Sequence, residues 1–108
     1  MATYLGKVKP GVGKDSKRGT WEFTEELLGY IPYPGTLNVF LDSPATFWKG
    51  AALLFDEFLC VEGTINDVPC NVCIKKNRLK SRMVFVVAPF NLRDMFGLVS
   101  NSTVELEF

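Results

Sequence analysis

Apolar and polar residues alternate along several short segments, which predicts a protein built mainly from β-strands. Successive side chains of a strand point to opposite faces, so an alternating apolar set marks the face that packs on a core. The clearest case is the segment Thr36–Leu41, in which every second residue is apolar. Further strands are expected at Thr3–Val8, Phe58–Gly63, Val68–Ile74, Met83–Ala88 and Thr103–Phe108.

The length and the strand spacing predict one small domain that covers residues 1–108. A chain of 108 residues suffices for a single core, and no repeat or linker divides it. Asn66-Asp67 separates two alternating segments, as in a hairpin, whereas Ala51–Phe58 fits either a helix or a strand. Short strands at short spacing favour a small closed β-barrel, because closure leaves no unpaired edge. Its core is expected to contain Leu37, Val39, Leu41, Val84, Val86, Val104 and Leu106.

Capping residues predict two short helices beside the strands. Trp21–Leu28 carries glutamates suited to the positive end of a helix, and Gly29 can end it. Asn91 can cap a second helix, Leu92–Phe96, which the following glycine would close.

Thr36 and Asn38 are the first candidates for chemistry. Alternation places both side chains on the polar face of their strand, beside Gly35, which allows close approach to the backbone. A hydroxyl and an amide oxygen suit Mg²⁺, which takes few protein oxygens and completes its shell with water and phosphate. The alternative is a polar pair on the wet side of a half-exposed strand.

The segment 29–38 resembles the G-[FY]-x-P-Y-x-G-T-L-N signature of the archaeal-type, CTP-dependent riboflavin kinases. The segment 88–98 is similar to their A-P-x-x-L-R-x-x-F-x-L block, and Gly11-Val12-Gly13 to the G-x-G of their nucleotide loop. The three blocks follow the family's order. The resemblance implies a six-stranded cradle-loop barrel, in which Thr36 and Asn38 bind Mg²⁺.

The same resemblance implies Mg²⁺-dependent transfer of the γ-phosphoryl group of CTP to the terminal ribityl hydroxyl of riboflavin, which yields FMN and CDP. Riboflavin and CTP would be the partners. Backbone groups of Gly11, Val12 and Gly13 would contact the nucleotide, together with a second stretch formed by Phe90, Asn91, Leu92 and Arg93. If the resemblance is left aside, Arg93 would be interpreted as an ordinary surface arginine, because arginine side chains are mostly exposed.

The chain departs from the family pattern at the expected flavin site. Phe85 stands where family members carry a glutamate, and Asn77 corresponds roughly to a threonine of theirs. The residues after Gly13 also differ from the family loop, and no general base can be named. The alternative function is therefore a cradle-loop module that binds a nucleotide or a flavin without turnover.

Charge and hydropathy narrow the expected partners and location. The net charge is zero, which gives no electrostatic case for nucleic acid. Ten of the twelve basic residues lie within 7–18 and 75–82, which form either a positive rim for phosphates or two solvated loops. The start has no signal-peptide pattern, and no apolar run is long enough for a membrane span. We expect a cytoplasmic protein, without membrane association and monomeric.

The three cysteines are expected to be free thiols that bind no metal. Cys70 and Cys73 are spaced as C-x-x-C, but the chain has no second pair and no histidine. On a strand, residues 70 and 73 face opposite sides. Cys60, Cys70 and Cys73 therefore fit small buried hydrophobes of a reducing compartment.

Overall fold

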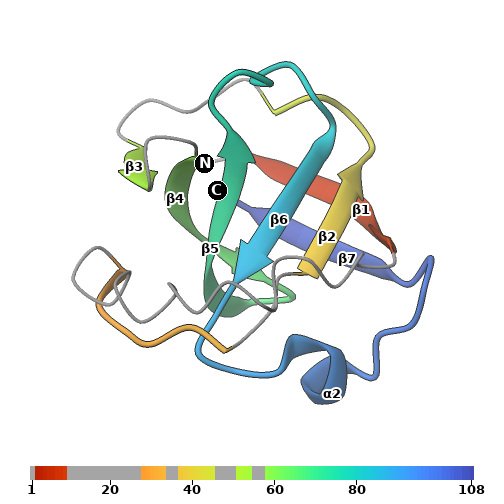
Figure 1. Cartoon of the computed structure of the whole chain (residues 1–108). Coiled ribbons are helices and arrows are strands. Elements are labelled where there is room, and N and C mark those ends of the chain that lie inside the picture. The colour runs from red at the N-terminus through yellow and green to blue at the C-terminus, as the bar shows by residue number, and fades with distance from the viewer. Residues whose placement is uncertain (1, 10–27, 34–36, 46–50, 55–57) are drawn as a thin grey trace.

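The computed structural model describes residues 2–9, 28–33, 37–45, 51–54 and 58–108. In these residues the strands and one helix follow one another along the chain as Figure 1 shows. Their bounds are β1 Thr3–Lys9, β2 Leu37–Leu41, β3 Ala52–Leu54, β4 Phe58–Ile65, β5 Val68–Lys75, β6 Met83–Val87, α2 Leu92–Phe96 and β7 Thr103–Glu107.

Six of these strands close into an antiparallel barrel, as the sequence predicts. The sheet order is β3-β4-β5-β6-β2-β1-β7, and an additional pairing of β4 with β7 closes the ring (Figure 1). Strand β3 pairs only with β4 and lies outside the ring. Closure pairs both edges of the six-stranded sheet, which removes the exposed hydrogen-bonding groups of an open edge.

The barrel interior is filled by the inward-facing residues of all six barrel strands. All seven residues predicted for the core are buried, with exposed fractions of 4% or less. A second, smaller apolar cluster lies on the outer face, where Phe58, Cys60, Cys73 and Val87 are buried under Leu28 and Phe85. The middle of the outer face of β4–β6 is therefore covered by apolar side chains.

Gly63 and the β4–β5 turn allow the ring to close. A Cβ atom at Gly63 would overlap the Glu107 carbonyl oxygen and lie 2.8 Å from the Phe108 Cβ atom, so only glycine permits this approach of β7. At the turn, Asn66 and Asp67 have positive φ angles of 47° and 68°, as a two-residue hairpin requires. Asn66 then exchanges hydrogen bonds with the Glu105 backbone through its own N–H and its Oδ1 atom.

The observed elements resolve most of the sequence expectations. The predicted hairpin is β4–β5, and Ala52–Leu54 within the ambiguous segment is a strand. Helix α2 has the predicted bounds, with the Asn91 side chain accepting from the Asp94 N–H and Gly97 at φ 61°. The helix expected at 21–28 lies outside the described residues except for its last position, and Gly29 after it has φ 82°.

The expectation of three free thiols is wrong for two of them. Cys60 and Cys73 form a disulfide between β4 and β5, with their Cα atoms 4.2 Å apart. The two residues lie directly opposite each other in the strand pairing, which brings their side chains together on the outer face. Cys70 is free and buried in the barrel core, so residues 70 and 73 do face opposite sides.

Candidate functional site

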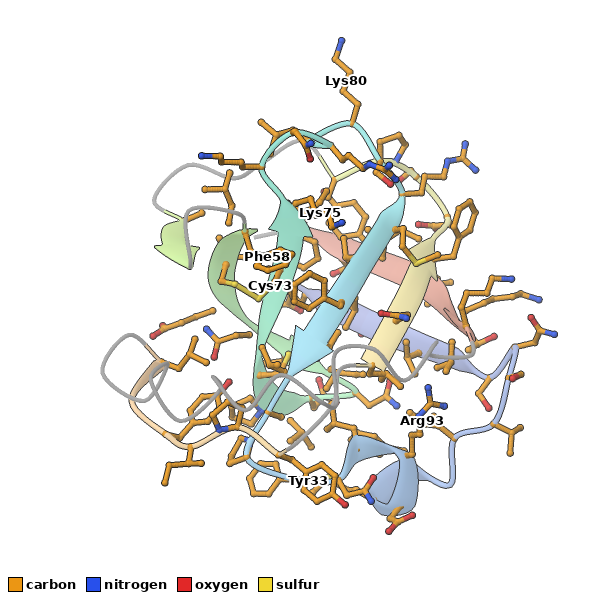
Figure 2. All side chains as sticks on the ribbon, viewed as in Figure 1. Tyr33, Phe58, Cys73, Lys75, Lys80 and Arg93 are labelled. Carbon is orange, nitrogen blue, oxygen red and sulfur yellow. A yellow bond between two sulfur atoms is a disulfide. The ribbon has the colours of Figure 1, made fainter. Side chains whose placement is uncertain are left out.

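A row of outward-facing residues crosses the barrel wall from β1 to β4. Lys9 lies opposite Asn38, Asn38 opposite Phe85, Phe85 opposite Cys73, and Cys73 opposite Cys60. We call these five residues the Asn38 row. Directly paired residues share one face of a sheet, so the row marks one continuous outer surface. In Figure 2 this surface faces the viewer, with Cys73 and Phe58 labelled upon it.

Asn38 offers an unused ligand atom on this surface. Its side chain is half-buried, and no described residue forms a hydrogen bond with its amide. Thr36, its expected partner, lies outside the described residues. The described residues contain no group of three or more His, Cys, Asp or Glu side chains placed to hold a metal ion. An amide oxygen is one of the ligand types that Mg²⁺ accepts beside phosphate and water.

Arg93 connects helix α2 to the end of β1. One of its guanidinium nitrogens donates to the Lys9 carbonyl oxygen over 3.4 Å. Lys9 is the last described residue before the segment 10–27, and Gly11, Val12 and Gly13 lie outside the described residues. The contact brings α2 to the end of β1, beside Asn38.

The two sequence blocks that carry the family resemblance meet in space. The Tyr33 backbone N–H donates to the Ala88 carbonyl oxygen at 2.8 Å, and Asn91 Nδ2 donates to the Tyr33 hydroxyl at 3.1 Å. Within this second block, Leu92 is buried in the core, so it can meet a ligand only through its backbone. Phe90 is 42% exposed and offers its ring to solvent.

The two basic segments approach each other beside Phe40. The Lys9 ammonium lies 5.8 Å from the centre of the Phe40 ring, and the Arg82 guanidinium lies 6.0 Å from it. Both cations therefore flank one exposed aromatic side chain at the edge of the candidate site. Lys75 of the second segment ends β5, and the residues after it form a loop in which Lys80 points away from the barrel (Figure 2).

The two residues expected at the flavin, Phe85 and Asn77, lie in different parts of the structure. Phe85 lies in the Asn38 row, and its ring packs edge-on against Phe58 at a centroid distance of 5.1 Å. Asn77 lies in the exposed loop after β5. Lys80 of that loop and Arg93 of α2 are at opposite ends of the barrel in Figure 2.

A polar pair that sequence patterns missed lies below the Asn38 row. The Tyr30 hydroxyl is 2.5 Å from Asn71 Oδ1 and 3.1 Å from the Val87 carbonyl oxygen. Burial, with a smaller contribution from Cys70, raises the pKa of the Tyr30 phenol, so it remains a proton donor at physiological pH. An asparagine between cysteine and valine in an otherwise apolar strand was the only sequence signal for this contact.

Comparison with known proteins decides the family. The profile labelled CTP-dependent riboflavin kinase, described as a domain of unknown function (DUF120), matches residues 16–108. The chain belongs to this family. The family's two motif blocks in this chain are the two segments that Tyr33 and Asn91 join.

Curated relatives of this riboflavin kinase family member are archaeal. A riboflavin kinase of Pyrobaculum islandicum is 31% identical, over 94% of this chain and 58% of its own length. A riboflavin kinase of Methanoregula boonei is 31% identical over 74% of this chain and 43% of its own length. One of Methanocorpusculum labreanum is 29% identical over 92% of this chain and 54% of its own length. The chain thus spans about half the length of the curated relatives it matches. Among the described residues, no helix has the length and apolar character of a membrane span.

Proposed function

We propose that this chain is a CTP-dependent riboflavin kinase, which transfers the γ-phosphoryl group of CTP to the terminal ribityl hydroxyl of riboflavin. The products are FMN and CDP, and the reaction takes place in the cytoplasm on a single domain. The observation that supports this proposal is the contact between the two family blocks, in which Asn91 donates to the Tyr33 hydroxyl. This contact lies beside the end of β1, where Arg93 donates to the Lys9 carbonyl oxygen.

Phosphoryl transfer requires positioned groups and charge neutralisation more than covalent help from the protein. Bound Mg²⁺ supplies that neutralisation by bridging phosphate oxygens. In this proposal Thr36 and Asn38 hold the ion through a hydroxyl and an amide oxygen. Gly11, Val12 and Gly13 contact the nucleotide through their backbone, and the segment from Phe90 to Arg93 forms the second wall of the nucleotide site.

Phe85 is the observation that favours a second candidate function. Its ring is packed against Phe58 in the outer cluster, at the position where family members carry a glutamate. A phenyl ring cannot accept a proton or a hydrogen bond from a flavin hydroxyl. The second candidate is therefore a module that binds a flavin or nucleotide, with Phe85 and Asn77 at the flavin, and does not turn it over.

One assay distinguishes the two functions. The purified protein is incubated with riboflavin, Mg²⁺ and each of CTP, UTP, ATP and GTP, and FMN is separated from riboflavin by chromatography. The kinase proposal expects FMN and CDP to form in equal amounts with CTP, and to disappear when Mg²⁺ is chelated. If no triphosphate yields FMN, the kinase proposal is overturned.

The variants Phe85→Glu and Phe85→Gln test the second candidate. They have similar size, but only glutamate supplies a carboxylate. If wild-type protein binds riboflavin without turnover, and Phe85→Glu alone gains turnover, the binding module is supported. If wild-type protein turns over faster than Phe85→Glu, Phe85 is compatible with catalysis, and the module function is excluded.

A further inference from the structure

The Cys60–Cys73 disulfide lies within the Asn38 row, beside a residue expected at the flavin. Cys73 lies directly opposite Phe85 in the pairing of β5 with β6, and Phe85 lies directly opposite Asn38 in the pairing of β6 with β2. Figure 2 shows Cys73 and Phe58 close together on this outer face. Along the row, Phe85 is therefore the one residue between the disulfide and Asn38.

Phe85 is also a side chain that can respond to a change at the disulfide. Cys60 and Cys73 are buried together with Phe58 in the outer cluster. Phe85 packs on this cluster but is only half-buried, and its ring contacts Phe58 edge-on. Because protein interiors are close-packed, an increase in volume inside the cluster has to be taken up by a neighbour. Leu28 and Phe85 are the partly buried neighbours, and only Phe85 belongs to the row that reaches β2.

Reduction by a dithiol is a reaction that increases this volume. In thiol–disulfide exchange the bond between the two protein sulfurs breaks, each protein sulfur gains one electron and one proton, and the dithiol leaves as a disulfide. The two thiols need more room than the disulfide, because sulfur atoms that are not bonded stay at van der Waals separation. Strands β4 and β5 remain paired along their whole length, so side chains rather than strands take up the added volume.

We propose that the Cys60–Cys73 pair is a redox-controlled positioning element of the flavin site. The disulfide keeps the Phe85 ring in its packed position, and reduction by a dithiol displaces that ring outward, into the space of the flavin, and weakens flavin binding. The inference rests on the proposed function and adds regulation to it. In the cytoplasm proposed for this chain, a disulfide is usually transient or redox-sensing. Cys70 is buried in the core on the other face of β5, so the pair can re-form without a competing thiol.

Control of flavin binding by the disulfide is reciprocal. If the oxidised protein binds riboflavin more tightly than the reduced protein, bound riboflavin stabilises the disulfide by the same factor. For a two-electron couple, a tenfold ratio of affinities lowers the reduction potential of the pair by about 30 mV at saturating riboflavin. A disulfide that only stabilises the fold would keep the same potential with and without riboflavin.

The test measures quenching of riboflavin fluorescence, in the dark, by oxidised protein and by protein reduced with excess dithiothreitol. The oxidised protein is expected to bind riboflavin about tenfold more tightly, which is at the lower end of what overpacking costs. Thiol counts in dithiothreitol redox buffers, with and without riboflavin, should show the shift of about 30 mV. Thermal unfolding verifies that the reduced protein is folded at the temperature of the measurement.

Three variants distinguish this mechanism from a general loss of stability. In the double variant Cys60→Ala, Cys73→Ala, dithiothreitol should leave riboflavin affinity unchanged. Phe85→Leu keeps the disulfide and an apolar cover but removes the ring, so its affinity should be nearly the same in both redox states. Phe40→Leu is the matched control, because Phe40 is an exposed ring outside the cluster, and this variant should respond to dithiothreitol like wild type.

Each contrary result has its own meaning. If oxidised wild type binds riboflavin no more tightly than reduced wild type, redox control is overturned and the kinase proposal stands. If excess dithiothreitol cannot reduce the pair, or if reduction unfolds the protein, the disulfide is a structural crosslink and redox control is overturned as well. A full response in Phe85→Leu overturns the role of Phe85. If neither redox state binds riboflavin, the proposed function falls together with its regulation.

Discussion

Asn91 and Tyr33 are joined by a hydrogen bond of 3.1 Å from the amide nitrogen to the phenol oxygen, although 58 positions separate them in the chain. The same Asn91 amide caps α2, with Oδ1 accepting from the Asp94 N–H at 3.2 Å and Nδ2 lying 2.9 Å from the Asp94 carboxylate. One side chain therefore couples the block at 29–38 to the start of the helix that carries Arg93.

Removing the cap should loosen the proposed nucleotide wall. Asn91→Ala is expected to lower the free energy of unfolding by about 1 kcal/mol, the usual worth of a helix cap. Affinity for Mg-CDP should fall as well, because Arg93 belongs to this helix and would move with it. Asn91→Ser is the control, since serine can cap the helix but cannot reach Tyr33 with an NH₂ group. Denaturant titrations give the stabilities, and equal loss in both variants would contradict a capping role.

Asn38→Leu should remove most Mg²⁺-dependent nucleotide binding without unfolding the barrel. The side chain faces outward and no described residue hydrogen-bonds its amide, so the substitution removes no contact within the described part of the barrel. If Thr36 shares the same ion, Thr36→Val should have a similar effect, and the double variant should be little worse than either. CTP titrations with and without Mg²⁺ measure this. Variants that bind Mg-CTP like wild type would leave Asn38 as a polar residue on the half-exposed outer face of β2.

The Cys60–Cys73 disulfide should contribute measurably to stability. The two residues are 13 positions apart, and closing a loop of that size contributes about 3 kcal/mol. The double variant Cys60→Ala, Cys73→Ala is expected to lose about that amount, and its denaturation midpoint should not respond to reductant. Wild type should lose a similar amount when reduced. A wild-type midpoint that reductant leaves unchanged would contradict this contribution.

Thiol counting checks the same bond by chemistry. Denatured, unreduced protein should show one reactive thiol, Cys70, and reduced protein should show three. In the folded protein even Cys70 should react slowly, because burial raises the pKa of its thiol to about 12 and the thiolate is the reactive form. Two or more thiols in unreduced, denatured protein would mean that the pair is open.

Barrel closure should depend on the absence of a side chain at Gly63. Gly63→Ala places a Cβ atom against the backbone of Glu107, and overpacking of this kind costs typically 1–3 kcal/mol. Gly97→Ala is the matched control, since its Cβ meets nothing within 4 Å and only its φ of 61° is unfavourable. We expect Gly63→Ala to be the less stable variant in thermal denaturation. The reverse order would mean that β7 shifts away from β4 at little cost.

Some of the structure could be predicted because it is set by neighbouring residues. Alternation assigned Leu37, Val39 and Leu41 to the core, and cap and stop residues placed α2 at Leu92–Phe96. The predicted hairpin turn at 66–67 also sets the pairing of its two strands. Residues whose numbers sum to 133 lie opposite each other, which places Cys60 opposite Cys73. The expectation of three free thiols overlooked this pairing.

The sequence by itself determined the strands, their buried faces, the short helix and the family motifs, because each depends on side-chain order within a few residues. Tertiary structure decided which strands are neighbours, and therefore which distant side chains meet. The closure of β4 on β7 at Gly63, the contact between Arg93 and the Lys9 carbonyl, and the pairing of Tyr30 with Asn71 all depend on that arrangement. The register between strands that no tight turn joins is chosen by the packing of the whole barrel, so no local pattern contains it.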